Sequence, residues 1–163
     1  MNGGFIMNEK LYLFNPFEIK KATEIELRDM YKLVFDKLKE EPNTMYEYSH
    51  NIEVYSNLCY ITGEIIARLT KDILELKTKI QIDTAINTTE ERKNWDSKKY
   101  GKAPAMSYFE ALATRISKDD INKLAEKECN LSRFKNSYSS LEEKINALKK
   151  RTDAIKYEEF GND

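Results

Sequence analysis

The amino-acid sequence predicts an all-α protein in which two long helices, over about 44–86 and 118–157, form a coiled-coil-like hairpin. Charged residues make up 34% of the 163 residues, with five Gly and three Pro, and this composition is typical of helical proteins. A stripe of residues alternately three and four positions apart is the second observation, because that spacing keeps one helix face against a partner helix. The stripe comprises Met45, Tyr48, Ile52, Tyr55, Cys59, Thr62, Ile66, Leu69, Ile73, Leu76, Ile80 and Asp83.

We expect a single helical domain over residues 23–163, preceded by a tail or extended segment over residues 1–22. The short apolar run from Leu11 to Phe14 is the only candidate strand in that tail. Thr23 and Glu26 have the spacing of a capping box, which predicts that a first helix begins there. That helix should reach about Glu40 before Pro42 ends it. Its apolar face would be Leu27, Met30, Tyr31, Val34 and Leu38.

The second helix has a wide apolar face in its first half and a narrow one in its second half. Val54, Leu58, Ile61 and Ile65 widen the stripe, so we expect the first half to lie in a bundle. From Ile66 the pattern narrows to a two-stranded seam. A helix of this length, roughly 60 Å, needs a partner helix in this chain or in another copy. The predicted oligomerisation residues are Ile66, Leu69, Ile73, Leu76, Ile80, Leu141, Ile145, Leu148 and Ile155.

A basic connector over residues 87–106 interrupts the helical pattern and is long for a compact domain. Ser107 and Glu110 have capping-box spacing, which predicts a short helix as far as about Ile116. The last helix should begin near Lys118, and its apolar stripe includes the four C-terminal oligomerisation residues named above.

Few residues are suited to catalysis. His50 is the single histidine, and we interpret it as a solvated surface residue. Neither a Gly-rich phosphate loop nor a Cys/His set with zinc-ligand spacing is present, so we predict no enzyme, metal site or cofactor. Cys59 and Cys129 lack CxxC spacing and are expected to be reduced thiols. Without a long apolar run or a secretory signal, we expect a cytoplasmic protein that does not contact a membrane.

The connector mixes cations with large aromatic residues and has Asp96 as its only acid between residues 92 and 102. Single-stranded nucleic acid is bound by this mixture, because cations neutralise phosphates and rings stack on bases. The alternative is a flexible basic loop whose Trp95 packs on the bundle, and both interpretations stay open. A second basic cluster, on the last helix, can equally serve to keep a coiled coil soluble. The candidate DNA-binding residues of the connector are Arg92, Lys93, Trp95, Lys98, Lys99, Tyr100 and Lys102.

Two segments resemble the UvsY-type recombination mediator proteins of tailed phages. Residues 51–56 (Asn-Ile-Glu-Val-Tyr-Ser) are similar to a segment near the start of that family's long helix, and residues 146–156 are similar to its closing helix. The order of long helix, basic interruption and long helix also matches. The resemblance implies a ring-like homo-oligomer in the cytoplasm of an infected bacterial host. It also implies DNA contacts near the end of the long helix, where this chain has Lys71, Lys77 and Lys79.

The resemblance implies a function as well: a protein that binds single-stranded DNA and helps to load a RecA-like recombinase onto strands covered by single-strand-binding protein. The expected partners are single-stranded DNA, the recombinase, the single-strand-binding protein and further copies of the chain. The rival hypothesis is a non-enzymatic coiled-coil structural or adaptor protein, such as a phage assembly or host-interaction factor, that binds only protein. Heptads and charge pattern alone favour that rival.

Overall fold

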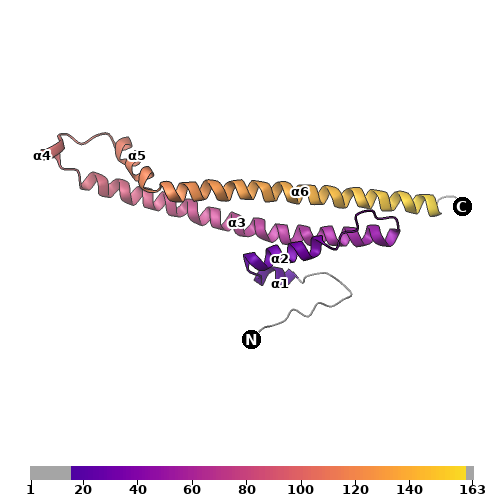
Figure 1. The fold of residues 1–163 in the computed structure, drawn as a ribbon. Coiled ribbons are helices and arrows are strands. Elements are labelled where there is room, and N and C mark those ends of the chain that lie inside the picture. The colour runs from indigo at the N-terminus through magenta and orange to yellow at the C-terminus, as the bar shows by residue number, and fades with distance from the viewer. Residues whose placement is uncertain (1–15, 161–163) are drawn as a thin grey trace, which may run out of the picture. The chain divides into compact units, whose positions relative to one another are not determined.

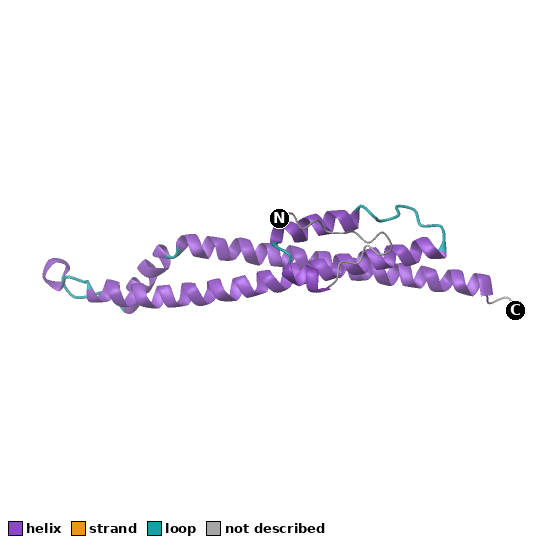
Figure 2. Ribbon diagram, turned by 90° about the horizontal axis from the view of Figure 1, so that it is seen from below, coloured by secondary structure: helices purple, strands orange, loops and turns teal. Residues whose placement is uncertain are grey.

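The computed structural model describes residues 16–160, and over that range it contains helices and no strand (Figures 1 and 2). The all-α prediction is therefore confirmed. Residues 1–15, with the apolar run from Leu11 to Phe14, lie outside the described residues, as do residues 161–163. The helices are α1 (Pro16–Lys21), α2 (Glu24–Phe35), α3 (Met45–Lys93), α4 (Ser97–Tyr100), α5 (Met106–Ile116) and α6 (Lys118–Phe160). The last part of the predicted tail, as α1, is helical rather than extended.

The chain divides into two compact units, each with its own buried residues. Unit 1 contains α1, α2, the part of α3 up to Ala67 and the part of α6 from Arg133. Unit 2 contains residues 68–132, which are the rest of α3 and α6 together with α4 and α5. The sequence predicted one domain over residues 23–163, and the boundary at Ala67 lies next to Ile66, where the predicted apolar face narrows.

Helix α2 begins with the predicted capping box and ends earlier than predicted. The Thr23 amide donates to Glu26 Oε2 at 2.6 Å, and the Glu26 amide donates to Thr23 Oγ1 at 3.3 Å. The helix ends at Phe35 instead of near Glu40. The reason is a tertiary contact. The Lys39 N–H donates to Asn51 Oδ1 at 2.8 Å, and Asn51 Nδ2 donates to the Lys39 carbonyl at 2.8 Å. A peptide held by α3 in this way cannot continue α2.

The core of unit 1 is formed by α2 against the wide face of α3. Leu27 and Val34 of α2 are buried, as are Leu58 and Ile61 of α3. Val54 and Ile65 are buried as well. This half of α3 packs against α2 with apolar residues that lie beside its 3,4 stripe. Its apolar face therefore has to be wider than the stripe alone. The prediction that the first half of the helix lies in a bundle is thus confirmed.

The 3,4 stripe of α3 is the covered side of that helix in both units. All twelve of its residues are buried or half-buried, whereas Leu74, next to the buried Ile73, is 66% exposed. The helix itself continues past the predicted end at Ile86 as far as Lys93. Residues 87–93 are polar but compatible with a helix, and Thr88 is buried with its hydroxyl donating to the Thr84 carbonyl at 2.7 Å. The connector outside α3 therefore begins at Asn94.

In unit 2, ion pairs join α3 to α6. Lys127 Nζ lies 2.7 Å from Asp72 Oδ2, and Lys79 Nζ lies 2.6 Å from Asp120 Oδ2. Lys77 adds a third pair, 2.7 Å from Glu128. The pairing of a later α3 residue with an earlier α6 residue means that the two helices run antiparallel here. Exposed pairs of this kind contribute little stability but fix the register of neighbouring helices.

Helix α5 does not have the predicted capping box. It begins after Pro104, with Ala105 as its N-cap and no side-chain cap, so Ser107 lies inside the helix. Proline restricts the residue before it and suits a helix entry, and this places the N-cap two residues ahead of Ser107. Phe109 and Ala113 are the buried residues of α5, with side chains that are 1% and 0% exposed.

Candidate nucleic-acid interface

The basic connector of unit 2 is built around one short turn of helix, and we call residues 92–102 the basic turn. Asp96 is the N-cap of α4, and its carboxylate accepts from the amides of Lys98 and Lys99 at 2.9 and 3.2 Å. Gly101 closes the turn with a φ of +79°, a conformation that other residues adopt only with strain. The only acid of the basic turn thus caps a helix, where part of its charge is compensated by backbone dipoles.

Trp95 anchors the basic turn to α5. Its ring lies 5.9 Å from the buried Phe109 ring and 6.2 Å from Tyr108, both edge to face, and 5.4 Å from Tyr100. The indole N–H donates to the Gly101 carbonyl at 3.0 Å. Trp95 therefore packs on rings of α4 and α5, and this contact leaves both interpretations of the connector open. The same packing holds the turn in one conformation.

The cations of the basic turn are exposed to solvent. None of Arg92, Lys93, Lys98, Lys99 and Lys102 is in an ion pair with any residue of the described range 16–160. Lys99 Nζ lies 5.0 Å from the centre of the Tyr100 ring, a cation–π distance.

Two tyrosine rings that contact Trp95 have much of their surface open to solvent. Tyr100 is 59% exposed and Tyr108 is 46% exposed, although both contact Trp95. Trp95 itself is half-buried and already uses its N–H. An incoming aromatic ring or base would therefore stack more readily on the tyrosines than on the tryptophan.

The three lysines suggested by the family resemblance are in ion pairs. Lys77 and Lys79 bind carboxylates of α6, as described above, and Lys71 lies 3.7 Å from Glu75 on its own helix. A phosphate at these positions would have to compete with carboxylates already in place. The charge available to a polyanion in unit 2 is therefore concentrated in the basic turn.

The nine predicted oligomerisation residues are covered within a single chain. Ile73 and Leu141 are buried, at 6% and 8% exposure, and the other seven are half-buried. Seven of the nine are covered only in part, so intrachain and interchain pairing of the long helices both stay open.

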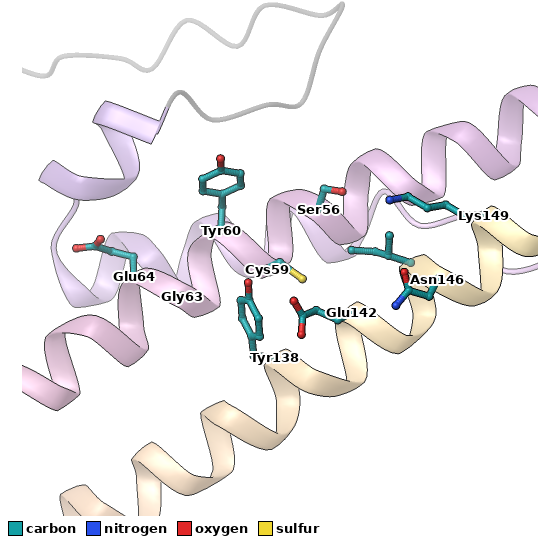
Figure 3. A pocket seen from close by; sticks show the side chains of 10 residues that line it. Ser56, Cys59, Tyr60, Gly63, Glu64, Tyr138, Glu142, Asn146 and Lys149 are labelled. Atoms are coloured by element: carbon teal, nitrogen blue, oxygen red, sulfur yellow. The ribbon is translucent and has the colours of Figure 1, made fainter.

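Unit 1 contains an open groove of about 670 Å³ between α3 and α6 (Figure 3). Cys59, Tyr138 and Glu142 face one another across it. Burial, with the nearby Glu142 carboxylate, raises the pKa of the Cys59 thiol, and the same two causes raise the pKa of the Tyr138 phenol. Both groups are therefore held in their neutral forms, which are poor nucleophiles. Cys59 is buried, Cys129 is exposed, and neither is in a disulfide.

His50 was interpreted from the sequence as a solvated surface residue, and that interpretation is wrong. It is half-buried, and its Nε2 lies 2.9 Å from the Lys37 carbonyl. No group of three or more potential metal-ligating side chains is found among residues 16–160. Within the same range, no helix has the length and apolar character needed to cross a bilayer.

Sequence reasoning identified the cations of the basic turn but missed the residues that shape it. Tyr108 and Phe109 fall within the predicted short helix without being singled out, and Gly101 and the capping role of Asp96 were not recognised. Two local signals were available: Asp followed by a short polar stretch, and Gly five residues later, are typical of a capped helical turn. The contact between Trp95 and Phe109 had no local signal.

Together, these observations define an all-α protein with an exposed, aromatic-supported basic turn. No family model, curated protein or solved structure matches the chain. The family resemblance therefore stays a prediction, and the function has to be argued from the residues themselves.

Proposed function

We propose that this protein binds single-stranded DNA through the basic turn, and that it acts as a recombination mediator in the cytoplasm of a phage-infected bacterium. In that role it helps a RecA-like recombinase to replace single-strand-binding protein on the DNA. The observation that carries the binding proposal is the group of five exposed cations, without ion pairs among the described residues, beside two exposed tyrosine rings. The mediator role depends in addition on the resemblance of residues 51–56 and 146–156 to the UvsY-type family.

The chemistry of the basic turn is suited to a single strand. Each cation that neutralises a phosphate releases a counterion, which favours binding at low salt. An exposed ring gains about 1–3 kcal/mol for each stacked base, and stacking accepts any base. Unpaired bases are required for stacking, so the tyrosines favour a single strand over a duplex. A turn held by Trp95 and Asp96 loses little conformational entropy on binding.

The weak charge of the whole chain is compatible with this role. A net charge of −1 provides no general attraction to DNA, so binding must depend on local charge. We propose that α3 and α6 pair as a hairpin that presents the basic turn, and that copies of the chain associate. Linked copies raise the effective concentration of each site, so that weak contacts act together on one strand.

Removing the lysines of the basic turn tests the proposal directly. We expect Lys98→Ala, Lys99→Ala and Lys102→Ala together to weaken binding of a labelled oligo-dT, measured by fluorescence anisotropy over a series of salt concentrations. With about 0.7 log units of salt dependence per phosphate contact, the slope should fall by about 2 if each lysine contacts one phosphate. The triple variant should keep its fold, because all three side chains are exposed.

A matched control changes three exposed lysines of α6 in unit 1: Lys144, Lys150 and Lys156. This variant loses the same charge, so a general effect of charge would weaken both variants equally. We expect the control to keep the wild-type salt slope. An equal loss in both variants, or a loss in the control alone, would place the DNA contact outside the basic turn.

Tyr100 allows stacking to be tested apart from charge. Tyr100→Ala should weaken oligo-dT binding without changing the salt slope, because the ring contributes no charge. Tyr157→Ala is the control, since Tyr157 is 82% exposed and lies on α6 far along the chain. Equal affinities of the two variants would exclude stacking on Tyr100.

The mediator role needs its own experiment, with three components. A RecA-like recombinase, single-stranded DNA and single-strand-binding protein are mixed, and the DNA-dependent ATP hydrolysis of the recombinase is followed. We expect the lag before hydrolysis to shorten when the wild-type chain is added, and to stay long with the triple lysine variant. DNA binding without any change in the lag would leave a DNA-binding protein that is not a mediator.

The second candidate function is a coiled-coil adaptor that binds only protein. The observation that favours it is a set of large side chains of unit 1 that are 70% or more exposed, namely Phe17, Ile25, Tyr46 and Tyr157. Exposed apolar groups of this size are common at protein interfaces. Absence of oligo-dT binding even at low salt would leave the adaptor as the better hypothesis.

A further inference from the structure

Helix α3 carries a second 3,4 repeat in unit 2, on the side opposite to its buried stripe. Every member of this repeat is exposed, whereas the first stripe is covered. We call it the outer stripe, and its members are Glu75, Thr78, Ile82, Ala85, Thr89 and Arg92. This spacing places all six side chains on one face of the helix. No described helix of unit 2 covers this face, since its members are exposed.

The middle of the outer stripe lacks the charges expected of a solvated face. The chain is 34% charged, so residues 80–89 should carry three or four charges, but Asp83 is the only one and it is half-buried. Ile82 and Ile86 are 53% and 50% exposed. An exposed, uncharged helix face in so charged a chain is typical of an interaction surface.

The two threonines of the outer stripe can be covered by apolar groups, because their hydroxyl groups already donate hydrogen bonds within the helix. The Thr78 hydroxyl donates to the Leu74 carbonyl at 2.9 Å, and the Thr89 hydroxyl donates to the Ala85 carbonyl at 2.9 Å. Each hydroxyl hydrogen is thus already bonded within the helix. The γ-methyl group remains for contact with a neighbour, so a partner can cover these threonines without leaving a donor unsatisfied.

The order of residues in the outer stripe is complementary to itself when reversed. About the point between Asp83 and Thr84, Ile82 is equivalent to Ala85, Thr78 to Thr89, and Glu75 to Arg92. An antiparallel copy of α3 therefore places the large Ile82 against the small Ala85 and the methyl group of Thr78 against that of Thr89. It also places the acidic Glu75 against the basic Arg92, and each of these contacts occurs twice. Two-fold interfaces have this form, because both copies present the same surface.

We propose that two copies of this chain associate through the outer stripe, with their α3 helices antiparallel. Glu75 of each copy then pairs with Arg92 of the other, in competition with its 3.7 Å contact to Lys71 on its own helix. Ala85 allows close approach of the helices at the centre. The contact from Glu75 to Arg92 is roughly 25 Å long at 1.5 Å per residue, short for an interface, so the pairing depends on concentration. This interface closes on itself, and a ring-like oligomer would need a further one.

The inference shares Arg92 with the basic turn but does not rest on DNA binding, and its test uses no nucleic acid. The weight-average mass of the full chain is measured by sedimentation equilibrium over a dilution series. We expect the mass to rise from 19.2 kDa toward twice that value with concentration, and Ile82→Glu to remain near 19.2 kDa throughout. Ile25→Glu, at a site on α2 that is 73% exposed, is the matched control and should associate like the wild type.

Exchanging the end charges separates this register from any other contact. Glu75→Lys and Arg92→Glu should each reduce association, because like charges would then face each other twice. The double variant restores opposite charges and should recover the wild-type curve. Circular dichroism of each variant checks the fold, and both side chains are exposed, so the fold should be unchanged.

A cross-link gives the direction of the pairing. Ile82→Cys and Ala85→Cys are made separately in a Cys129→Ser background, because Cys129 is exposed. Mixed under oxidising conditions, they should form a disulfide-linked pair faster than either variant alone. A chain that stays at 19.2 kDa at every concentration, an Ile82→Glu variant that still associates, or a double charge variant without recovery would each overturn the proposal.

Discussion

Asn51 explains, at the scale of one residue, why α2 cannot continue through Lys39. Its side chain is 3% exposed and satisfies both the N–H and the carbonyl of Lys39. From the sequence alone, Asn51 stands out only as part of the segment 51–56 that resembles the UvsY-type family. The structure gives it a physical role, because it fixes the segment between α2 and α3. No local pattern could have predicted this bond, since its partners are twelve residues apart.

Asn51→Ala should destabilise the protein by about 1–3 kcal/mol, because it removes two part-buried hydrogen bonds, one to the N–H and one to the carbonyl of Lys39. Asn57→Ala is the matched control. Asn57 is also buried, but its amide donates only to the Glu53 carbonyl of its own helix, so its loss should cost less. Urea unfolding followed by circular dichroism measures both values. Equal losses would mean that the Lys39 contact contributes nothing beyond burial.

At the scale of the helix, the sequence predicted which side of α3 is covered but not where the helices end. The 3,4 stripe was sufficient to predict the covered side, because the period of the apolar residues indicates the face that a helix buries. The end of α2 at Phe35 depends on a tertiary contact, and the end of α3 at Lys93 depends on polar residues that are compatible with a helix. Neither end has a periodic signal in the sequence. The Ser107 capping box failed for a related reason: Pro104 sets the start of α5 ahead of it.

The link between α3 and α6 at Lys79 and Asp120 should be visible in acid. The hydrogen bond from Lys79 is the main cause that lowers the Asp120 pKa below its usual 3.8. A lowered carboxyl pKa stabilises the fold above pH 3.8, and this contribution is lost as the pH falls through the lower pKa of the folded state. Lys79→Ala should return the Asp120 pKa toward 3.8, as measured by NMR titration of the Asp120 carboxyl carbon.

Lys123 provides the control for this titration, since it also bonds Asp120 but at 3.4 Å rather than 2.6 Å. Lys123→Ala should move the Asp120 pKa less than Lys79→Ala does. If Asp120 titrates at the same pH in the wild type and in Lys79→Ala, the pair between the helices is not formed in solution.

At the scale of the whole molecule, two compact units share two continuous helices. Leu58→Ala removes a fully buried side chain from unit 1 and should cost about 2–5 kcal/mol. Because the units have separate buried residues, we expect amide hydrogen exchange to quicken in α2 more than in α5. Mass spectrometry of peptides from the two helices measures this. Equal acceleration in both would mean that the chain unfolds as one cooperative unit.

The candidate site was predictable in composition but not in form. Cations and aromatic residues close together in sequence were enough to mark residues 92–102. Their arrangement could not be deduced, because Phe109 supports Trp95 from another helix and Lys77 and Lys79 are paired with residues of α6. A cationic side chain that the sequence shows is available to a ligand only if it is not paired with a carboxylate in the folded protein.

Trp95 is the only tryptophan of the chain, and it lies between Tyr100 and Phe109. Its intrinsic fluorescence therefore comes from one place, next to the rings on which bases would stack. The protein carries a built-in optical reporter: titration with unlabelled oligonucleotide can be followed by quenching of its emission, with no dye attached to either molecule. A shift toward the red would signal instead that the indole has moved into water.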